Sequence, residues 1–497
     1  MRSDVVSFSA EPQPDSLPSR ALPLGSRAAS SILVFLVLVF ALATRAGQLL
    51  NDPDSQWHMA VGRWIVAHRA VPWTDLFSHT FAGAPWIAKE WASQVLLYGA
   101  YAGAGWWGVC MLTILVIAAS LAGLHLWLAR RISATAALMV VTAAFIVLGP
   151  HLLARPHVFT VPILLVWTMG LVTALERGRT PSLWLALAMA AWANLHGSYP
   201  IGLVIAGSLA GEGVFSGPRP EWIGRAVRWA GFLALATAAS SLTPYGYAPF
   251  LVNLGLFNSG ESLPFISEWQ PLGLDGAGVI AGAMLIGGIV ILSAAPRRNL
   301  FRLGLIALLG VMMIRHSRFA DLFVLAAPIL VVGPALARFP RLRAEPARAV
   351  SMRWGLMILA GALTAFTTAL LVSPRLSAEM TPLAALDAAR SKGLTGPVYN
   401  DYDFGGFLIR SGVPTFIDGR SDQLFLGGFM NGLHQALDAP GNERFAALLA
   451  RHGVTWALVR REGLSADHLR RLEGWRLLHQ DEVAAVYYDA GPAPTQP

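Results

Sequence analysis

Residues 29–58 read ASSILVFLVLVFALATRAGQLLNDPDSQWH, an apolar run that leads directly into two carboxylates. Crossing a hydrocarbon core about 30 Å thick takes about 20 mainly apolar residues. Residues 29–49 meet that requirement, and Asp52 and Asp54 follow them with one residue between the two acids. The stretch therefore predicts a membrane-spanning helix with acidic groups at one end, at the membrane surface.

Similar apolar runs occupy most of the chain. It is 55% hydrophobic and 13% charged, with a mean hydropathy of +0.53, values outside the range of soluble globular proteins. Length and apolarity predict about eleven spans. They lie near residues 29–49, 107–129, 134–150, 157–175, 181–194, 199–215, 228–242, 276–294, 300–314, 319–337 and 354–373. The predicted fold is mainly α, a polytopic transmembrane helical bundle.

Arginine clusters between the predicted spans indicate which way the chain faces, because short loops rich in Lys and Arg stay cytoplasmic. All the clusters fall on one side when the spans are counted: Arg20/Arg27, Arg130-Arg131, Arg177/Arg179, Arg219/Arg225/Arg228, Arg297-Arg298/Arg302 and Arg338/Arg341/Arg343/Arg348/Arg353. The N-terminus is therefore predicted to be cytoplasmic. Since these arginines lie in short loops and not along one face, the net charge of +8 does not indicate a nucleic-acid partner.

This topology divides the chain into three predicted parts. Residues 1–28 form a polar, disordered cytoplasmic tail, residues 29–373 a transmembrane domain with a long first outer loop at 50–106, and residues 374–497 an extracytoplasmic α/β domain. The α/β prediction rests on short β-type runs at 397–399, 415–418, 456–459 and 483–488 between helical patterns near 427–437, 442–451 and 464–472.

Composition and one short motif bear on where the chain resides. Lysine occurs only twice while arginine is abundant, a bias that favours a GC-rich bacterial source. We therefore predict a multi-pass protein of the bacterial inner (plasma) membrane with its C-terminal domain in the periplasm or outside the cell. Ala41-Leu42-Ala43 allows a different interpretation of the first span as a cleaved signal peptide, which would leave the sidedness of the later segments unchanged.

The first outer loop holds the paired carboxylates Asp52 and Asp54. Two carboxylates in this spacing can bind a divalent cation, or one can act as a base while the other orients it. The structural alternative is that they begin a helix, where Asp is favoured. The loop is also rich in Trp, which is typical of a segment lying in the headgroup region, and an interfacial helix would explain that without catalysis.

Other polar groups are predicted on the same outer side. Arg155, His196, Arg315 and Arg318 lie at the outer ends of spans, and Glu268 lies in the middle outer loop at about 243–275. Arginine on the outer side runs against the positive-inside bias, so each such arginine indicates a partner, for which a phosphate group is well suited. An ion pair with Asp321 or with the first-loop carboxylates is the alternative.

This pattern resembles the GT-C superfamily of membrane glycosyltransferases, which use polyprenyl-phosphate or polyprenyl-diphosphate sugars as donors. Asp401-Tyr402-Asp403-Phe404-Gly405 is similar to the Trp-Trp-Asp-Tyr-Gly segment of its oligosaccharyltransferase branch, and Ile266-Ser267-Glu268 to that branch's Thr-Ile-x-Glu motif. Asp401 and Tyr402 replace the two tryptophans that read the acceptor sequon, so asparagine-linked transfer is not predicted. The first loop also looks like that of a group of uncharacterised bacterial membrane proteins.

The resemblance implies sugar transfer from a polyprenyl-phosphate-linked donor to an extracytoplasmic glycan, lipid or protein in envelope assembly. It implies that a first-loop acid, here Asp54 or Asp52, is catalytic. Asp52, Asp54 and Glu268 become candidate ligands of a divalent cation, Mg²⁺ or Mn²⁺, with a metal-free site as the alternative. The candidate substrate-binding residues are Arg155, His58, His196, Arg315, Arg318, Asp403 and Glu90. A transporter and a non-catalytic envelope scaffold are the rival interpretations.

Overall fold

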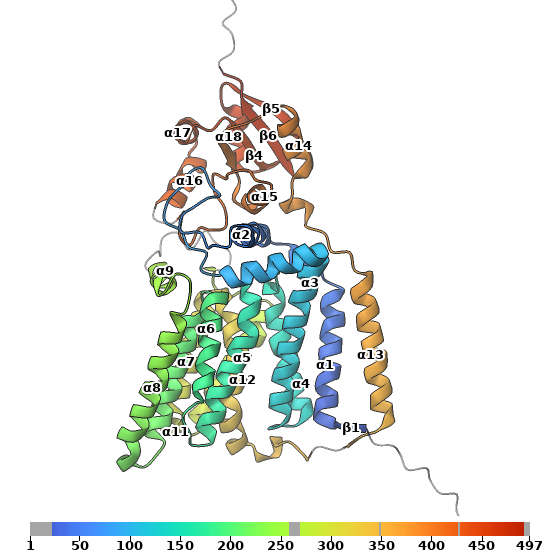
Figure 1. Ribbon diagram of the computed structural model, residues 1–497, viewed down its shortest axis with the longest axis vertical. Coiled ribbons are helices and arrows are strands. Elements are labelled where there is room, and N and C mark those ends of the chain that lie inside the picture. The colour runs from blue at the N-terminus through green and yellow to red at the C-terminus, as the bar shows by residue number, and fades with distance from the viewer. Residues whose placement is uncertain (1–21, 258–268, 347–348, 426–427, 492–497) are drawn as a thin grey trace, which may run out of the picture.

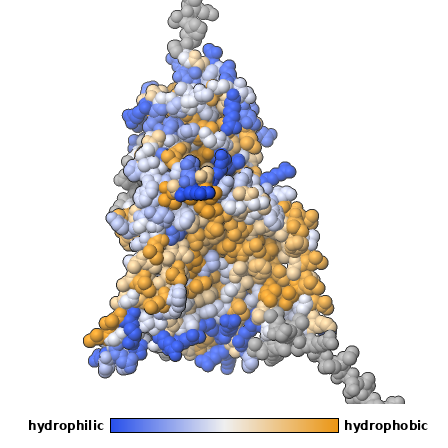
Figure 2. Space-filling view, viewed as in Figure 1, coloured by the Kyte–Doolittle hydropathy of each residue, from blue (hydrophilic) through white to orange (hydrophobic). Residues whose placement is uncertain are grey.

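The computed structural model describes residues 22–257, 269–346, 349–425 and 428–491 of the chain. Long helices run side by side in a bundle, and a small sheet with short helices covers one end of it (Figure 1). Hydrophobic side chains gather over the bundle, whereas hydrophilic ones gather over the sheet and over the opposite end (Figure 2). The apolar surface therefore lies where a membrane would surround the bundle.

Each predicted span coincides with a helix of the bundle. The helices are α1 (Ser26–Ala43), α3 (Trp91–Ala129), α4 (Ala134–Leu148), α5 (Thr160–Glu176), α6 (Ala186–Leu195), α7 (Tyr199–Phe215), α8 (Trp222–Ser240), α10 (Gly276–Ser293), α11 (Pro296–Arg315), α12 (Ala320–Arg338) and α13 (Met352–Leu371). Seven helical segments of the described chain are long and apolar enough to cross a membrane: Ser26–Ala43, Trp91–Ala129, Ala134–His151, Pro156–Glu176, Gly276–Ser293, Ser317–Arg338 and Met352–Leu371. These identify a multi-pass membrane protein, while the count of eleven stays a prediction.

The first outer loop is largely helical. Helix α2 (Asp54–His68) and the beginning of α3 lie across the end of the bundle, and α3 then turns down into it (Figure 1). The turn falls at Gly105, whose φ of +59° is a left-handed conformation that glycine adopts without a Cβ clash. The predicted second span begins at this turn, so the boundary between outer loop and span follows from one glycine.

The C-terminal region contains a four-stranded sheet in the order β3-β4-β6-β5. Strand β3 (Val398–Asn400) pairs parallel with β4 (Trp456–Arg460), while β6 (Ala484–Asp489) pairs antiparallel with both β4 and β5 (Trp475–Gln480). The flanking helices are α14 (Leu383–Ser391), α15 (Gly405–Arg410), α16 (Phe429–Leu437), α17 (Glu443–Arg451) and α18 (Leu464–Arg471). This confirms a small mixed sheet with helices, although the predicted boundary near residue 374 stays a prediction.

One predicted strand is wrong. Residues 415–418 join no named strand, and Thr415 forms an isolated parallel bridge with Ser78 of the first outer loop. The apolar pair Phe416-Ile417 suggested a strand, but both side chains are buried in a core shared with that loop. Trp57 and Trp86 of the loop belong to the same core, so tertiary packing determined this segment.

Candidate functional site

A buried ion-paired cluster joins the first outer loop to the segment before α5. Asp52 and Asp54 are 4% and 7% exposed. Arg155 places Nε 3.0 Å from Oδ2 of Asp52, and its Nη2 forms an ion pair with Oδ2 of Asp54. One guanidinium therefore bridges the two carboxylates that the sequence singled out.

Local hydrogen bonds explain why these groups meet. Asp54 begins α2, and its backbone N–H donates to Oδ1 of Asp52 (3.2 Å), so the helix start fixes the spacing of the acids. Ser55 Oγ donates to the carbonyl of Ala154 (3.1 Å), which holds the segment carrying Arg155 beside that start. The helix-start and site interpretations of the acids are thus compatible.

The C-terminal region closes over Asp54. The indole N–H of Trp57 donates to Oδ1 of Asp54 (3.0 Å). A Cβ added at Gly419 would overlap the Asp54 carboxylate, and one added at Gly406 would overlap the carbonyl of Pro53. Two backbone segments of the C-terminal region therefore pack against the start of α2 with no room for a side chain, Gly419 against the Asp54 carboxylate and Gly406 against the Pro53 carbonyl.

Tyr402 lies in the same place. Burial, and next the negative charge of Asp54, raise the pKa of the Tyr402 phenol well above its ordinary value. Its hydroxyl lies 3.4 Å from Oγ of Ser421. Tyr402 therefore presents a protonated hydroxyl to the region around Asp54 and Arg155.

Further polar side chains lie around the ion-paired cluster of Asp52, Asp54 and Arg155. The Gln94 amide donates to Nδ1 of His58 (3.1 Å), and Nε2 of His196 lies 3.4 Å from Oε1 of Glu90. Burial lowers the pKa of His58 well below its ordinary value, and the positive charge of Arg155 adds to that effect. Burial raises the pKa of Glu90, and the charge of Lys89 offsets this only in part.

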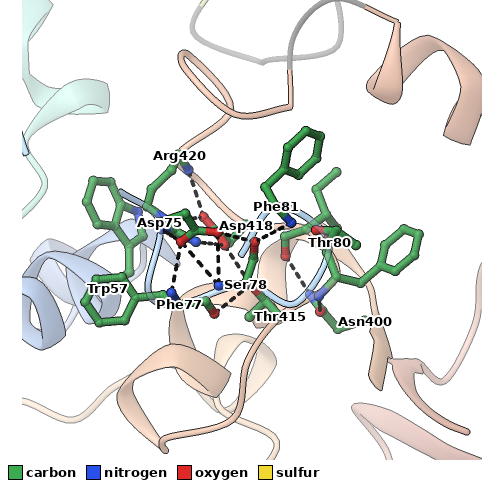
Figure 3. A network of polar contacts seen from close by, with 12 residues as sticks. Trp57, Asp75, Phe77, Ser78, Thr80, Phe81, Asn400, Thr415, Asp418 and Arg420 are labelled. Atoms are coloured by element: carbon green, nitrogen blue, oxygen red, sulfur yellow. Dashed lines mark hydrogen bonds and ion pairs between the residues drawn. The ribbon is translucent and has the colours of Figure 1, made fainter. Parts of the chain in front are cut away.

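A fully buried ion-pair network attaches the C-terminal region to the loop (Figure 3). Arg420 donates from Nε and Nη2 to both oxygens of Asp418 (2.8 and 2.7 Å), and its Nη1 pairs with Asp75 of the first outer loop. Arg420 and both acids have no exposed side-chain surface. The network brackets Gly419, so it fixes the backbone that packs against Asp54.

Some of the predicted site residues contact Asp52 and Asp54 in the structure, whereas others have different partners. Arg155 takes the first-loop carboxylates as partners, whereas Asp321 pairs with His151 (3.1 Å). Arg318 stacks on Trp269 at 4.6 Å. Arg315 is exposed at the end of α11, and Asp403 pairs with Arg460 (2.5 Å) at a half-exposed position of the C-terminal region. Glu268, with the Ile266-Ser267-Glu268 motif, lies outside the described residues.

Several neighbours of the site were missed by the sequence analysis. Lys89 forms an ion pair with Asp422, and its charge acts on both His58 and Glu90. Trp57 and Gly419 contact Asp54 directly. More than 350 positions separate Asp54 from Gly419 in the sequence, so spacing carries no signal for that contact.

The two carboxylates do not offer a metal the usual open set of oxygen ligands. Arg155 occupies both of them, and within the described ranges no group of three or more His, Cys, Asp or Glu side chains is arranged to hold a metal ion. As arranged, Asp52 and Asp54 fit a guanidinium. The divalent-cation site with Glu268 as a third ligand stays an untested prediction.

Comparison with known proteins places this arrangement in a known fold. No family model and no curated protein matches the sequence. The apo oligosaccharyltransferase of Archaeoglobus fulgidus is 11% identical, with a TM-score of 0.52, and the match covers 87% of this chain and 70% of that one. The chain has the fold of GT-C membrane glycosyltransferases. The predicted resemblance is thereby confirmed.

Two further GT-C structures are similar. Archaeal oligosaccharyltransferase AglB from Archaeoglobus fulgidus, in complex with an inhibitory peptide and a dolichol-phosphate, is 11% identical, with a TM-score of 0.53 and coverage of 87% of this chain and 69% of that one. ArnT from Cupriavidus metallidurans, bound to undecaprenyl phosphate, is 16% identical, with a TM-score of 0.49 and coverage of 93% and 99%. At these identities the likeness concerns the fold.

Proposed function

We propose that this chain is a membrane glycosyltransferase that moves a sugar from a polyprenyl-phosphate-linked donor to an acceptor outside the cytoplasm. The observation that carries the proposal is the bridge from Arg155 to Asp52 and Asp54 in a GT-C fold. In this bridge, the Arg155 guanidinium can bind the donor phosphate, and the Asp54 carboxylate beside it can bind the acceptor hydroxyl.

The cation side of the site suits a lipid-linked phosphate. Arg155 binds carboxylates through a planar fork of N–H donors, and that fork has the same fit to phosphate oxygens. Lys89, whose ammonium pairs with Asp422, also acts with Arg155 on the pKa of His58, so its charge reaches the same region. Both would stabilise the negative charge that develops on the leaving phosphate.

The carboxylate side suits an acceptor hydroxyl. In the proposed step the acceptor oxygen bonds to the anomeric carbon of the sugar while the bond from that carbon to the phosphate oxygen breaks. The acceptor proton passes to Asp54, and the polyprenyl phosphate leaves as an anion held by Arg155. Trp57 and Asp52 orient Asp54 and Arg155, so the two charges stay fixed relative to each other.

The N-terminus and the arginine-rich loops are proposed to face the cytoplasm, with the site outside. Asp54 begins α2, which lies at the end of the bundle covered by the C-terminal sheet, while the loops after α3, α5 and α12 lie at the other end (Figure 1). Those loops carry three of the arginine clusters, which the positive-inside rule assigns to the cytoplasm. We therefore propose a site on the outer face of a bacterial inner membrane, where envelope glycoconjugates are assembled.

The test is sugar release by purified protein in lipid. Radiolabelled polyprenyl-phosphate sugars are incubated with wild type, with Asp54→Asn and with Asp467→Asn, each with Mn²⁺ and with EDTA. Asp467 is a half-exposed acid of α18 in a surface pair with Arg470, so its variant controls for loss of one carboxylate. We expect release by wild type and Asp467→Asn and a loss of at least about 100-fold in Asp54→Asn.

The opposite results separate the rival functions. Full release by Asp54→Asn would remove that residue from the mechanism. Binding of lipid-linked sugar without release, together with movement of the lipid between leaflets, would favour a transporter. Absence of binding to the whole donor panel by a folded protein would favour a scaffold, and the glycosyltransferase proposal would then fail.

A further inference from the structure

Two adjoining cavities lie at the end of the bundle opposite to Asp54, on either side of the loop that follows α5. One, of about 380 Å³, lies between this loop and helices α7 and α8, and the other, of about 480 Å³, lies between the loop and the end of α5. Arg179 and Thr180 line both. Helix α5 has 17 residues and separates these cavities from the Arg155 segment by about 25 Å.

The cavities carry an excess of positive charge. Three carboxylates at this end already have arginine partners: Glu176 with Arg131, Glu212 with Arg302, and Glu221 with Arg225. Arg177, Arg179 and Arg228 line the cavities, and none of the three forms an ion pair with a residue that the structure describes. Arg228 therefore lines the first cavity, Arg177 the second and Arg179 both, and no carboxylate of the described chain pairs with these three guanidinium groups.

The side chains that line the two cavities indicate which class of anion they can bind. The hydroxyls of Thr180 and Ser216 stand among the guanidinium groups, a combination suited to phosphate oxygens. The second cavity has an apolar side formed by Met169, Gly170 and Ala174, with the hydroxyl side chains of Thr173 and Ser182 next to it. A phosphate attached to an acyl chain satisfies both parts, whereas a free phosphate would leave the apolar wall unused.

The surroundings place these cavities at a membrane surface. Trp184 is 79% exposed just after the loop, and Ile223 is 80% exposed at the start of α8, so apolar side chains face outward beside the arginines. Exposed Trp next to basic residues is typical of the headgroup region. Hydrophilic side chains gather at this end of the bundle (Figure 2).

We propose that these cavities bind the headgroup of an anionic glycerophospholipid of the inner leaflet. The lipid phosphate lies among Arg177, Arg179 and Arg228, and its acyl chain runs along the wall at Met169 and Gly170. The site is separate from the proposed transfer reaction, and its occupancy would anchor the loop between α5 and α6.

Native mass spectrometry of the full chain in detergent tests this. Phosphatidylglycerol, phosphatidylcholine and inorganic phosphate are titrated against wild type and against the triple variant Arg177→Gln, Arg179→Gln, Arg228→Gln. The matched control is Arg130→Gln, Arg341→Gln, Arg353→Gln, which removes the same charge from exposed positions that line neither cavity. Circular dichroism and thermal melting verify that each variant is folded.

We expect saturable binding of phosphatidylglycerol over phosphatidylcholine, weakened at least tenfold in the cavity variant and unchanged in the control. Equal weakening in both variants would show attraction to net charge alone and overturn the site. Displacement of phosphatidylglycerol by inorganic phosphate at equal concentration would identify a free-phosphate site and overturn the lipid assignment. Equal affinity for the two lipids would overturn it as well.

Discussion

The α-carbon of Gly419 packs directly against the carboxylate of Asp54, so closely that a Cβ at this position would overlap Oδ1. The contact joins the first outer loop to the C-terminal region at the acid that we propose as the base. It exists because Arg420 and Asp418, on either side of Gly419, are locked in a buried network with Asp75. The C-terminal region thus helps to shape the site.

Replacing Gly419 by alanine should displace Asp54. Overpacking a closed contact costs about 1–3 kcal/mol of stability, so the melting temperature should fall only moderately. Because the displaced group is the proposed base, we expect a large loss of sugar release in the same variant. Gly432→Ala in α16 is the control, since a Cβ there meets no atom within 4 Å. Unchanged release by Gly419→Ala would show that this contact does not position Asp54.

Sugar release should require the guanidinium group of Arg155 and not only a positive charge at this position. Removing a preorganised donor that stabilises developing charge costs about 10²–10³-fold in rate, so we expect that loss of sugar release in Arg155→Gln. Arg155→Lys keeps the charge but cannot bridge Asp52 and Asp54 with a planar fork, so it should recover only part of the rate. Arg461→Gln, at a half-exposed position, is the control. Full rate in Arg155→Lys would mean that charge alone suffices.

The network of Asp75, Asp418 and Arg420 should contribute strongly to stability. Leaving one partner of a buried ion pair unpaired costs about 3–5 kcal/mol, so Asp75→Asn should lower the melting temperature clearly. The half-exposed pair of Asp403 and Arg460 offers the comparison, because solvent screening limits such pairs to about 0–1 kcal/mol. Thermal melting in detergent checks both. Similar small shifts in Asp75→Asn and Asp403→Asn would contradict the assignment of the network as the attachment point.

His58 should make the fold sensitive to acid. Its pKa is lowered in the folded protein by burial and by the charges of Arg155, His196, His157 and Lys89, in that order. When the pH falls below the ordinary pKa of 6.5, His58 is therefore protonated in the unfolded chain but stays neutral in the folded protein. The free energy of unfolding then falls by about 1 kcal/mol per pH unit.

His58→Gln removes this proton from both states while keeping a polar group beside Gln94. The measurement is the melting temperature of wild type and variant between pH 7.5 and 5.5. We expect a flatter profile for the variant over the acidic half of that range. Parallel profiles would mean that another group governs the acid sensitivity.

Much of the fold could be predicted from the sequence because membrane helices are set by local composition. Every apolar run that predicted a span coincides with a helix, and the turn at Gly105 lies two residues before the predicted second span. The strand predicted at 415–418 was wrong because Phe416 and Ile417 are buried by packing against the first loop and not by pairing in the sheet.

The sequence by itself determined the bundle, the proximity of Asp52 to Asp54 and the resemblance to GT-C enzymes. These follow from apolar length, from adjacent positions and from short motifs, all of which are local properties of a chain. Only the tertiary structure decided that Arg155 bridges the acids, that Gly419 and Tyr402 border Asp54, and that Arg318 and Asp403 have other partners. Contacts between segments so far apart depend on how the loop and the sheet pack in space, and spacing along the chain does not encode that packing.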